Sequence, residues 1–122
     1  PNNETALFIY MDLEDDFTEN INLLIRDLGN SKLTLEEIVK TERADLETQA
    51  KILSSERIVL PSKEYQRMVM TAPFYGEDLK FIQHFLLKDS KVYILTFTAL
   101  ETDFSKYEKV AEQIMQSFKF RE

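Results

Sequence analysis

One apolar segment limits what this chain can fold into. Residues 92–100 read Val-Tyr-Ile-Leu-Thr-Phe-Thr-Ala-Leu, which is the longest near-continuous run of β-branched, aromatic and aliphatic residues in the sequence. A strand with one face in water would alternate apolar and polar side chains, and this run does not alternate. The sequence therefore predicts a strand that is covered on both of its faces.

The segments on either side of this run predict a hairpin and a helix. Residues 79–87 form a second strand-like run, and the polar tetrad 88–91 between the two runs has the length of a hairpin connection. After the second strand, apolar side chains recur at the spacing of one helical stripe, at Tyr107, Val110, Ala111, Ile114, Met115 and Phe118. Ser105 and Glu108 have the spacing of a capping box and predict where this helix begins.

The preceding part of the chain predicts further strands and one more helix. We expect strands at residues 6–11, 20–27, 57–60 and 64–72. A second capping box, Thr34-Leu35-Glu36-Glu37, opens a helix. The apolar side of that helix comprises Leu35, Ile38, Val39, Leu46, Ala50 and Leu53. Hairpins without βαβ alternation predict an α+β fold, an antiparallel sheet of about six strands with two helices packed on it, as a single domain over residues 1–122.

Three packing patterns resemble the PsbP family and its bacterial relatives. Residues 17–25, followed by the Leu-Glu-Glu of the first helix, resemble the family's second strand and the helix after it. Residues 92–100 resemble its central Tyr-hydrophobic-Leu-Thr-hydrophobic strand, and Ile-Met-Gln-Ser-Phe at 114–118 resembles the end of its closing helix. The likeness covers most of residues 6–120, but the family's aromatic-Pro-x-x-Trp entry strand is absent and the chain has no tryptophan.

The resemblance implies a PsbP-like fold, which is shared with a small eukaryotic protein that binds the GTPase Ran. It also implies a non-enzymatic accessory or protein-interaction module, and it transfers no functional residue to a numbered position here. Many bacterial members are exported or lipid-anchored. Because the chain begins at Pro1 rather than at a methionine, we expect a removed leader and an extracytoplasmic or cell-envelope location rather than a cytoplasmic one.

Composition excludes several classes of partner and chemistry. The net charge is −7, and residues 1–30 alone contribute −6 of it. An acidic chain lacks the attraction to phosphate on which binding to nucleic acids or anionic membranes depends, so we expect neither partner. The absence of cysteine rules out disulfides and thiolate metal sites. No apolar run approaches the length of a transmembrane helix, and we expect a monomer or a weak dimer.

Two surface features suggest a protein-binding site. The acidic cluster comprises Asp12, Glu14, Asp15, Asp16 and Glu19. It does not have the spacing of an EF-hand loop, because Phe17 and Leu23 occupy the positions that need Gly and Glu. We weigh contact with a basic partner against a solvated loop or a hard-cation site. The second feature is the turn at residues 73–78, where Phe74 and Tyr75 are either interface anchors or, for Phe74, a cover for the sheet.

No pattern in the chain points to catalysis. His84 is the only histidine, and its place within a strand offers no partner that would make it a general base. Two glycines are too few for a P-loop or a dinucleotide fingerprint, and no Gly-x-Ser-x-Gly elbow occurs. We therefore expect no enzyme activity, cofactor or metal. The alternative function is a carrier of a small apolar ligand in a pocket between sheet and helix. Met68, Met70 and Met115 would line this pocket; otherwise these methionines are core residues that fill gaps.

Overall fold

The computed structural model describes residues 4–10 and 19–120. The elements, in chain order, are β1 (Glu4–Tyr10), β2 (Asn20–Asp27), α1 (Leu35–Leu46), β3 (Lys51–Val59), β4 (Glu64–Phe74), β5 (Glu77–Lys88), β6 (Lys91–Leu100) and α2 (Glu101–Gln116). The six strands form one antiparallel sheet in the order β1-β2-β6-β5-β4-β3. The predicted α+β fold class is confirmed.

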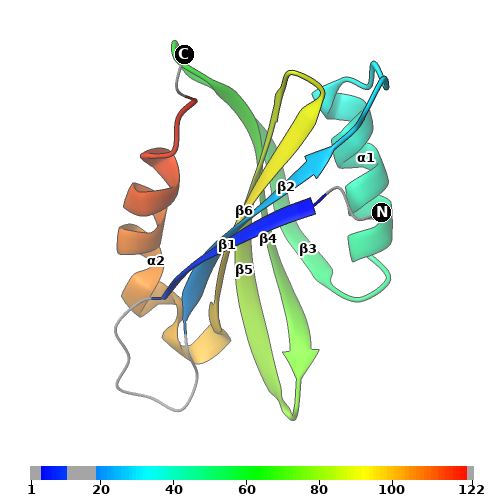
Figure 1. The fold of residues 1–122 in the computed structure, drawn as a ribbon. Helices are drawn as coiled ribbons and strands as arrows, with labels where there is room; N and C mark the ends of the chain where they lie inside the picture. Colours follow the sequence, from blue (N-terminus) through cyan, green and yellow to red (C-terminus); the bar gives the residue numbers. More distant parts are fainter. Residues whose placement is uncertain (1–3, 11–18, 121–122) are drawn as a thin grey trace.

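The β5–β6 hairpin lies at the centre of the sheet, as Figure 1 shows. Six consecutive residues of β6, 94–99, are buried, which confirms a strand covered on both faces. The turn between the two strands needs only Asp89 and Ser90, both with positive φ (52° and 61°). Two successive residues with positive φ are the signature of a type I′ turn, whose twist matches that of the flanking strands.

The two helices lie on opposite faces of the sheet (Figure 1). The α2 face is buried around Ile21, Tyr65, Val69, Ile82, Leu86, Leu95, Phe97, Ala99, Phe104, Ala111 and Met115. The α1 face is buried around Ile38, Val39, Met68, Met70, Phe85, Val92 and Ile94. Because strand side chains alternate between faces, Met68 and its neighbour Val69 belong to different layers of the core.

The predicted end of the first helix and the predicted start of the following strand are wrong. α1 ends at Leu46, so Ala50 and Leu53 are not helical, and β3 begins at Lys51 rather than at Arg57. Thr48 ends the helix by donating from its backbone N and from Oγ1 to the carbonyl of Asp45 (3.2 and 2.7 Å). The capping box at Thr34 is confirmed: Glu37 N donates to Thr34 Oγ1, and Thr34 N to the Glu37 carboxylate.

The second capping box does not exist, because α2 begins four residues before Ser105. Leu100, the last residue of β6, is the N-cap, and it makes no side-chain cap bond. The buried ring of Phe104 packs at a tilt of 43° against Phe97 of β6, with ring centroids 5.7 Å apart, and this contact holds the first turn of the helix directly after the strand. Packing rather than capping therefore sets the start of α2.

Candidate functional site

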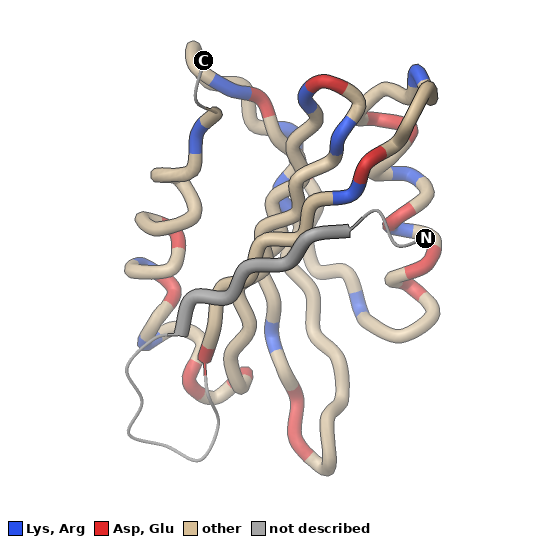
Figure 2. The backbone as a smooth tube through the Cα atoms, viewed as in Figure 1, with Lys and Arg blue, Asp and Glu red and all other residues tan. Residues whose placement is uncertain are grey.

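The tip of the β4–β5 hairpin carries the most exposed aromatic side chain of the described residues. Tyr75 is 92% exposed and Phe74 is 42% exposed, and their rings meet edge to face with centroids 4.6 Å apart. Glu77 and Asp78 follow, both exposed, so an acidic pair borders the aromatic pair (Figure 2). Phe74 is therefore only partly exposed, and Tyr75 is the ring that the turn presents to solvent.

The backbone of this turn explains why the rings are held outward. Tyr75 and Gly76 both have positive φ (47° and 83°), which again is the type I′ arrangement. The left-handed region suits Gly76, but a tyrosine there costs about 1 kcal/mol because its Cβ crowds the following carbonyl. The fold therefore keeps an unfavourable residue at the tip. Such strain is typical of positions under functional constraint.

The acidic cluster is mostly outside the described residues. Asp12, Glu14, Asp15 and Asp16 all lie in the stretch 11–18, for which the structure gives no description. Glu19 departs from the prediction, because its side chain is fully buried rather than part of an acidic surface. The residue directly precedes β2, whose alternation places Ile21 in the core, and Glu19 shares that inward direction.

A pocket of about 200 Å³ lies between the sheet and the end of α1. We call it the α1 pocket, and its lining residues are Leu46, Gln49, Ala50, Met70, Ala72, Phe81, Gln83 and Thr96. Met70 lines it as the sequence suggested, while Met68 is fully buried in the same layer of the core. Met115 cannot join them because it belongs to α2 and packs on the opposite face of the sheet.

One polar group in the α1 pocket stands out. Gln83 Nε2 donates to Thr96 Oγ1 across the β5–β6 ladder (3.1 Å), in a pair that the strand register sets directly opposite each other. Gln83 Oε1 is buried and has no hydrogen-bond partner. Buried amide oxygens are ordinarily paired, since an unpaired one loses its hydration without compensation.

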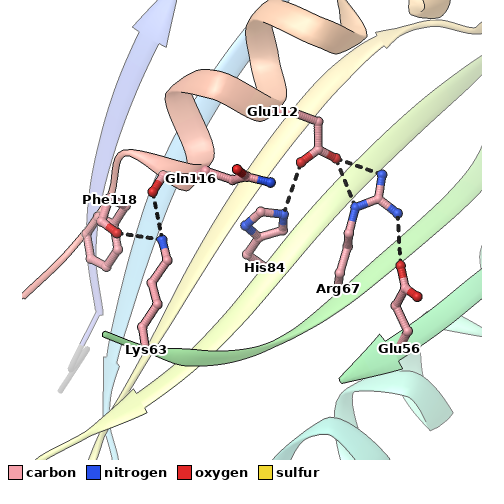
Figure 3. A network of polar contacts seen from close by, with 7 residues as sticks. All are labelled: Glu56, Lys63, Arg67, His84, Glu112, Gln116 and Phe118. Atoms are coloured by element: carbon pink, nitrogen blue, oxygen red, sulfur yellow. Dashed lines mark hydrogen bonds and ion pairs between the residues drawn. The ribbon is translucent and has the colours of Figure 1, made fainter. Parts of the chain in front are cut away.

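On the α2 face, His84 lies in a buried polar network that Figure 3 shows. The imidazole is fully buried and stacks on Tyr65 with ring centroids 4.3 Å apart. Its Nε2 lies 3.8 Å from Glu112 Oε2 of α2, and neither ring nitrogen makes a hydrogen bond. Burial first, and then the nearby charges of Arg67 and Lys63, lower the pKa of His84 to about 3. The imidazole is therefore neutral at physiological pH, and its contact with Glu112 is not an ion pair.

Two cations tie α2 to the sheet around this histidine. Arg67 Nε and Nη2 both donate to Glu112 Oε1 (2.9 and 2.7 Å), and Nη1 lies 3.7 Å from Glu56. Lys63 Nζ donates to the carbonyls of Gln116 and Phe118 (3.0 and 2.6 Å), which lie at the end of α2 (Figure 3). A cation is favourable there because the last carbonyls of a helix have no helical partner. The network therefore fastens the helix, and a fully buried imidazole within it cannot reach a substrate in solvent.

Sequence reasoning missed these polar groups because their partners are distant along the chain. Cross-strand register sets Glu56 opposite Arg67 and Arg67 opposite His84, while Glu112 comes from α2. The only available sign was a lone histidine in an apolar strand. Within residues 4–10 and 19–120, no cluster of three or more His, Asp or Glu side chains is arranged to hold a metal ion. Over the same residues, neither helix has the length and apolar character needed to cross a membrane.

Comparisons with known proteins identify the fold. The sequence matches no protein-family model and none of the curated proteins with which it was compared. Among solved structures, PA94 from Pseudomonas aeruginosa, a protein of unknown function considered a candidate regulator, has a TM-score of 0.84 at 16% identity, covering 98% of this chain and 85% of its own.

Two further structures place this fold among PsbP-like proteins. Cyanobacterial PsbP (CyanoP) from Synechocystis sp. PCC 6803 has a TM-score of 0.66 at 10% identity, covering 99% of this chain and 94% of its own. LpqN, which is involved in cell envelope biogenesis of Mycobacterium tuberculosis, has a TM-score of 0.55 at 9% identity, over 92% and 80%. The chain thus has a PsbP-like fold, as the sequence patterns predicted.

Proposed function

We propose that this protein is a non-enzymatic protein-interaction module that binds a partner through the tip of its β4–β5 hairpin. The observation that carries the proposal is the aromatic pair at this tip, with Tyr75 92% exposed at a strained turn and Phe74 42% exposed beside it. Solvent-exposed aromatic rings cost free energy in the free protein, and burying them in a partner's pocket recovers it. Tyrosine is also among the residues most enriched at energetic centres of interfaces.

Charge indicates the kind of partner. Glu77 and Asp78 border the rings, and the chain as a whole carries a net charge of −7. A partner with an apolar pocket inside a basic rim would match both features and would bind more slowly as salt increases. The acidic cluster Asp12, Glu14, Asp15 and Asp16 remains part of this proposal as a second contact for the same basic surface.

The test is capture of the partner by variants of the hairpin tip. Chemical cross-linking in the source cell, followed by affinity capture, is compared for wild type and the double variant Phe74→Ser/Tyr75→Ser. Loss of two anchor rings should weaken binding by at least about 30-fold, and so remove the captured partner. Val59→Ser is the matched control, because Val59 is also an exposed apolar residue (70%) but lies on β3.

Asp15→Lys/Asp16→Lys tests the second contact in the same assay. Capture undiminished by the double serine variant would refute the hairpin as the binding site. A collapse of its melting temperature would instead show that the rings support the fold. We also propose a monomer or weak dimer located in the cell envelope; the likeness to LpqN supports the location, which cell fractionation tests.

We propose a second candidate function, carriage of a small apolar ligand, which the α1 pocket favours. Five of its eight lining residues are apolar, and the volume is about 200 Å³. Native mass spectrometry of the purified protein tests this function. A co-purified mass that disappears after an Ala50→Phe substitution would support carriage in this pocket, and an unliganded spectrum from freshly prepared protein would count against it.

A further inference from the structure

We infer that the α1 pocket is the second half of the protein-binding surface whose first half is the tip of the β4–β5 hairpin. A single basic protein partner encloses Tyr75 and inserts one large apolar side chain of its own into the pocket. The inference rests on the first proposed function, binding through the hairpin tip, and specifies the extent of the surface and the chemistry of the partner.

The pocket and the tip lie on one face of the same hairpin. Met70, Ala72 and Phe74 alternate along β4, which pairs with β5 in an unbroken register, so their side chains point to the same face of the sheet. Met70 and Ala72 line the α1 pocket, and Phe74 lies about 7 Å further along the strand. Tyr75 extends this apolar surface, because its ring meets that of Phe74 edge to face. The pocket and the tip therefore form one continuous surface.

The end of α1 leaves this surface open to a partner. The helix ends at Leu46, and the β4–β5 hairpin continues past it toward its tip (Figure 1). Four apolar side chains of the pocket lining, Leu46, Ala50, Ala72 and Phe81, keep part of their surface accessible. Covering such surface is favourable because it removes apolar area from water. A partner can therefore make its contacts with accessible groups alone and does not need to reach the buried floor of the pocket.

The pocket has the size of one apolar side chain. A cavity of about 150 Å³ accepts benzene, so about 200 Å³ accommodates the end of a leucine, methionine or phenylalanine side chain. The pocket is open to solvent on one side. A free small molecule would keep part of its surface in water there, whereas a partner protein covers the open side with the rest of its own surface. The shape therefore favours a side chain delivered by a partner.

The charges around this surface indicate a basic partner. Four exposed carboxylates border it, two at the end of α1 and two after the tip: Asp45, Glu47, Glu77 and Asp78. Arg43 lies 3.3 Å from Glu47 and offsets part of its charge. Of the two lysines adjacent in sequence to the lining, Lys51 is exposed, whereas Lys80 lies over the ring of Phe104 on the α2 face. The remaining carboxylates attract Lys and Arg side chains placed around the apolar anchor of the partner.

Photo-cross-linking at single positions tests the inference in the source cell. A benzophenone amino acid replaces Tyr75, Gln49 or Val110, one position in each variant. Gln49 is exposed and lines the pocket, while Val110, 48% exposed on α2, is the control on the opposite face. We expect the probes at Tyr75 and Gln49 to label the same protein, and the probe at Val110 not to label it. The peptide attached at Gln49 should carry a large apolar residue flanked by Lys or Arg.

Affinity for the purified partner then measures the contribution of the pocket. Ala50→Phe fills the pocket and should weaken binding at least about tenfold. Ala44→Phe is the matched control and should leave the affinity unchanged, since Ala44 is exposed on α1 and does not line the pocket. If Ala50→Phe does not fold, the partner supplies the second measurement. Alanine in place of its labelled apolar residue should weaken binding to the wild-type chain by a similar factor.

The outcomes separate the inference from the function on which it rests. If neither Tyr75 nor Gln49 labels a protein, binding through the tip fails and the inference fails with it. If Tyr75 labels a partner but Gln49 does not, or if Ala50→Phe leaves the affinity unchanged, the tip binds alone and the inference is refuted. Equal labelling from Val110 would mean that the contact is not specific to this face. An acidic or wholly polar peptide at Gln49 would overturn the chemistry of the partner, and a small molecule that co-purifies in the pocket would overturn occupancy by a side chain.

Discussion

Acid should destabilise this protein through His84, and replacing His84 with leucine should remove the effect. The folded state holds the pKa of this imidazole at about 3, whereas a histidine in the unfolded chain has a pKa of about 6.5. Between these two pH values His84 binds a proton in the unfolded chain but not in the folded protein. Stability must therefore rise with pH in this window, and fall as pH drops below about 6.5.

The size of the effect follows from the two pKa values. From pH 8 to pH 5.5 the protonation of the unfolded histidine should lower the free energy of unfolding by about 1.4 kcal/mol. The lower limit of pH 5.5 keeps the measurement above the isoelectric point of about 4.8, where an acidic protein loses its repulsive charge. Leucine has nearly the volume of histidine, lacks its two unbonded nitrogens and does not titrate.

Urea unfolding of wild type and His84→Leu at pH 8, 6.5 and 5.5 measures this difference. The two proteins differ only in the imidazole, so wild type should lose about 1.4 kcal/mol more than the variant. Because the chain has only one histidine, a single imidazole NMR signal follows the titration without any assignment. A signal that titrates near pH 6.5 in the folded protein, or identical pH dependence of the two proteins, would refute the burial of a neutral His84 as the cause.

Three further substitutions test the packing of the fold by urea unfolding. Glu112→Ala removes the main partner of Arg67, whose side chain is only 19% exposed, and should lower the free energy of unfolding by about 2–3 kcal/mol. Most of this loss should be recovered in the double variant Glu112→Ala/Arg67→Met, which no longer leaves a buried charge unpaired. An equally large loss in the double variant would contradict this interpretation. Thr34→Ala removes the capping box of α1 and should cost about 1 kcal/mol, while Thr102→Ala, a helical position without a capping role, is the control. Ser90→Gly relieves a positive φ in the β5–β6 turn and should add up to about 1 kcal/mol, and any destabilisation would mean that the serine side chain contributes at that position.

The parts of the fold that depend on short-range patterns could be predicted from the sequence. Residues 92–100 are apolar throughout and form a strand buried on both faces, and the adjoining hairpin needs only a short polar link. The end of α1 could not be predicted in the same way. Ala50 and Leu53 continue the helical spacing of Leu46 by coincidence, because α1 ends at Leu46 and Leu53 belongs to the edge strand β3, where it is 46% exposed. Spacing alone does not distinguish a buried stripe from scattered apolar residues.

The candidate sites also differ in whether they are formed by neighbours in the sequence or by residues that strand pairing brings together. The exposed rings at Phe74 and Tyr75 follow from a local turn, so the sequence indicated them. The network around His84 and the Gln83–Thr96 pair depend on strand register, which aligns residues 11 or more positions apart, as in the pairing of Glu56 with Arg67. Register is set by the whole pattern of the sheet rather than by the neighbours of any one residue. Residues of this kind become recognisable only once the strands are paired.

The pocket and the early end of α1 have a common cause in the lengths of the elements. A helix of 12 residues spans about 18 Å, whereas β5, also of 12 residues, spans about 40 Å. α1 therefore covers less than half of the strand beneath it, and the α1 pocket lies where the helix stops, at Leu46 and Ala50. On the opposite face, α2 is longer by four residues and is fastened by Arg67 and Lys63. α1 thus leaves more of its face of the sheet uncovered than α2 does, and a ligand in the α1 pocket, if carriage is correct, would lie on the face opposite the Arg67–Glu112 network.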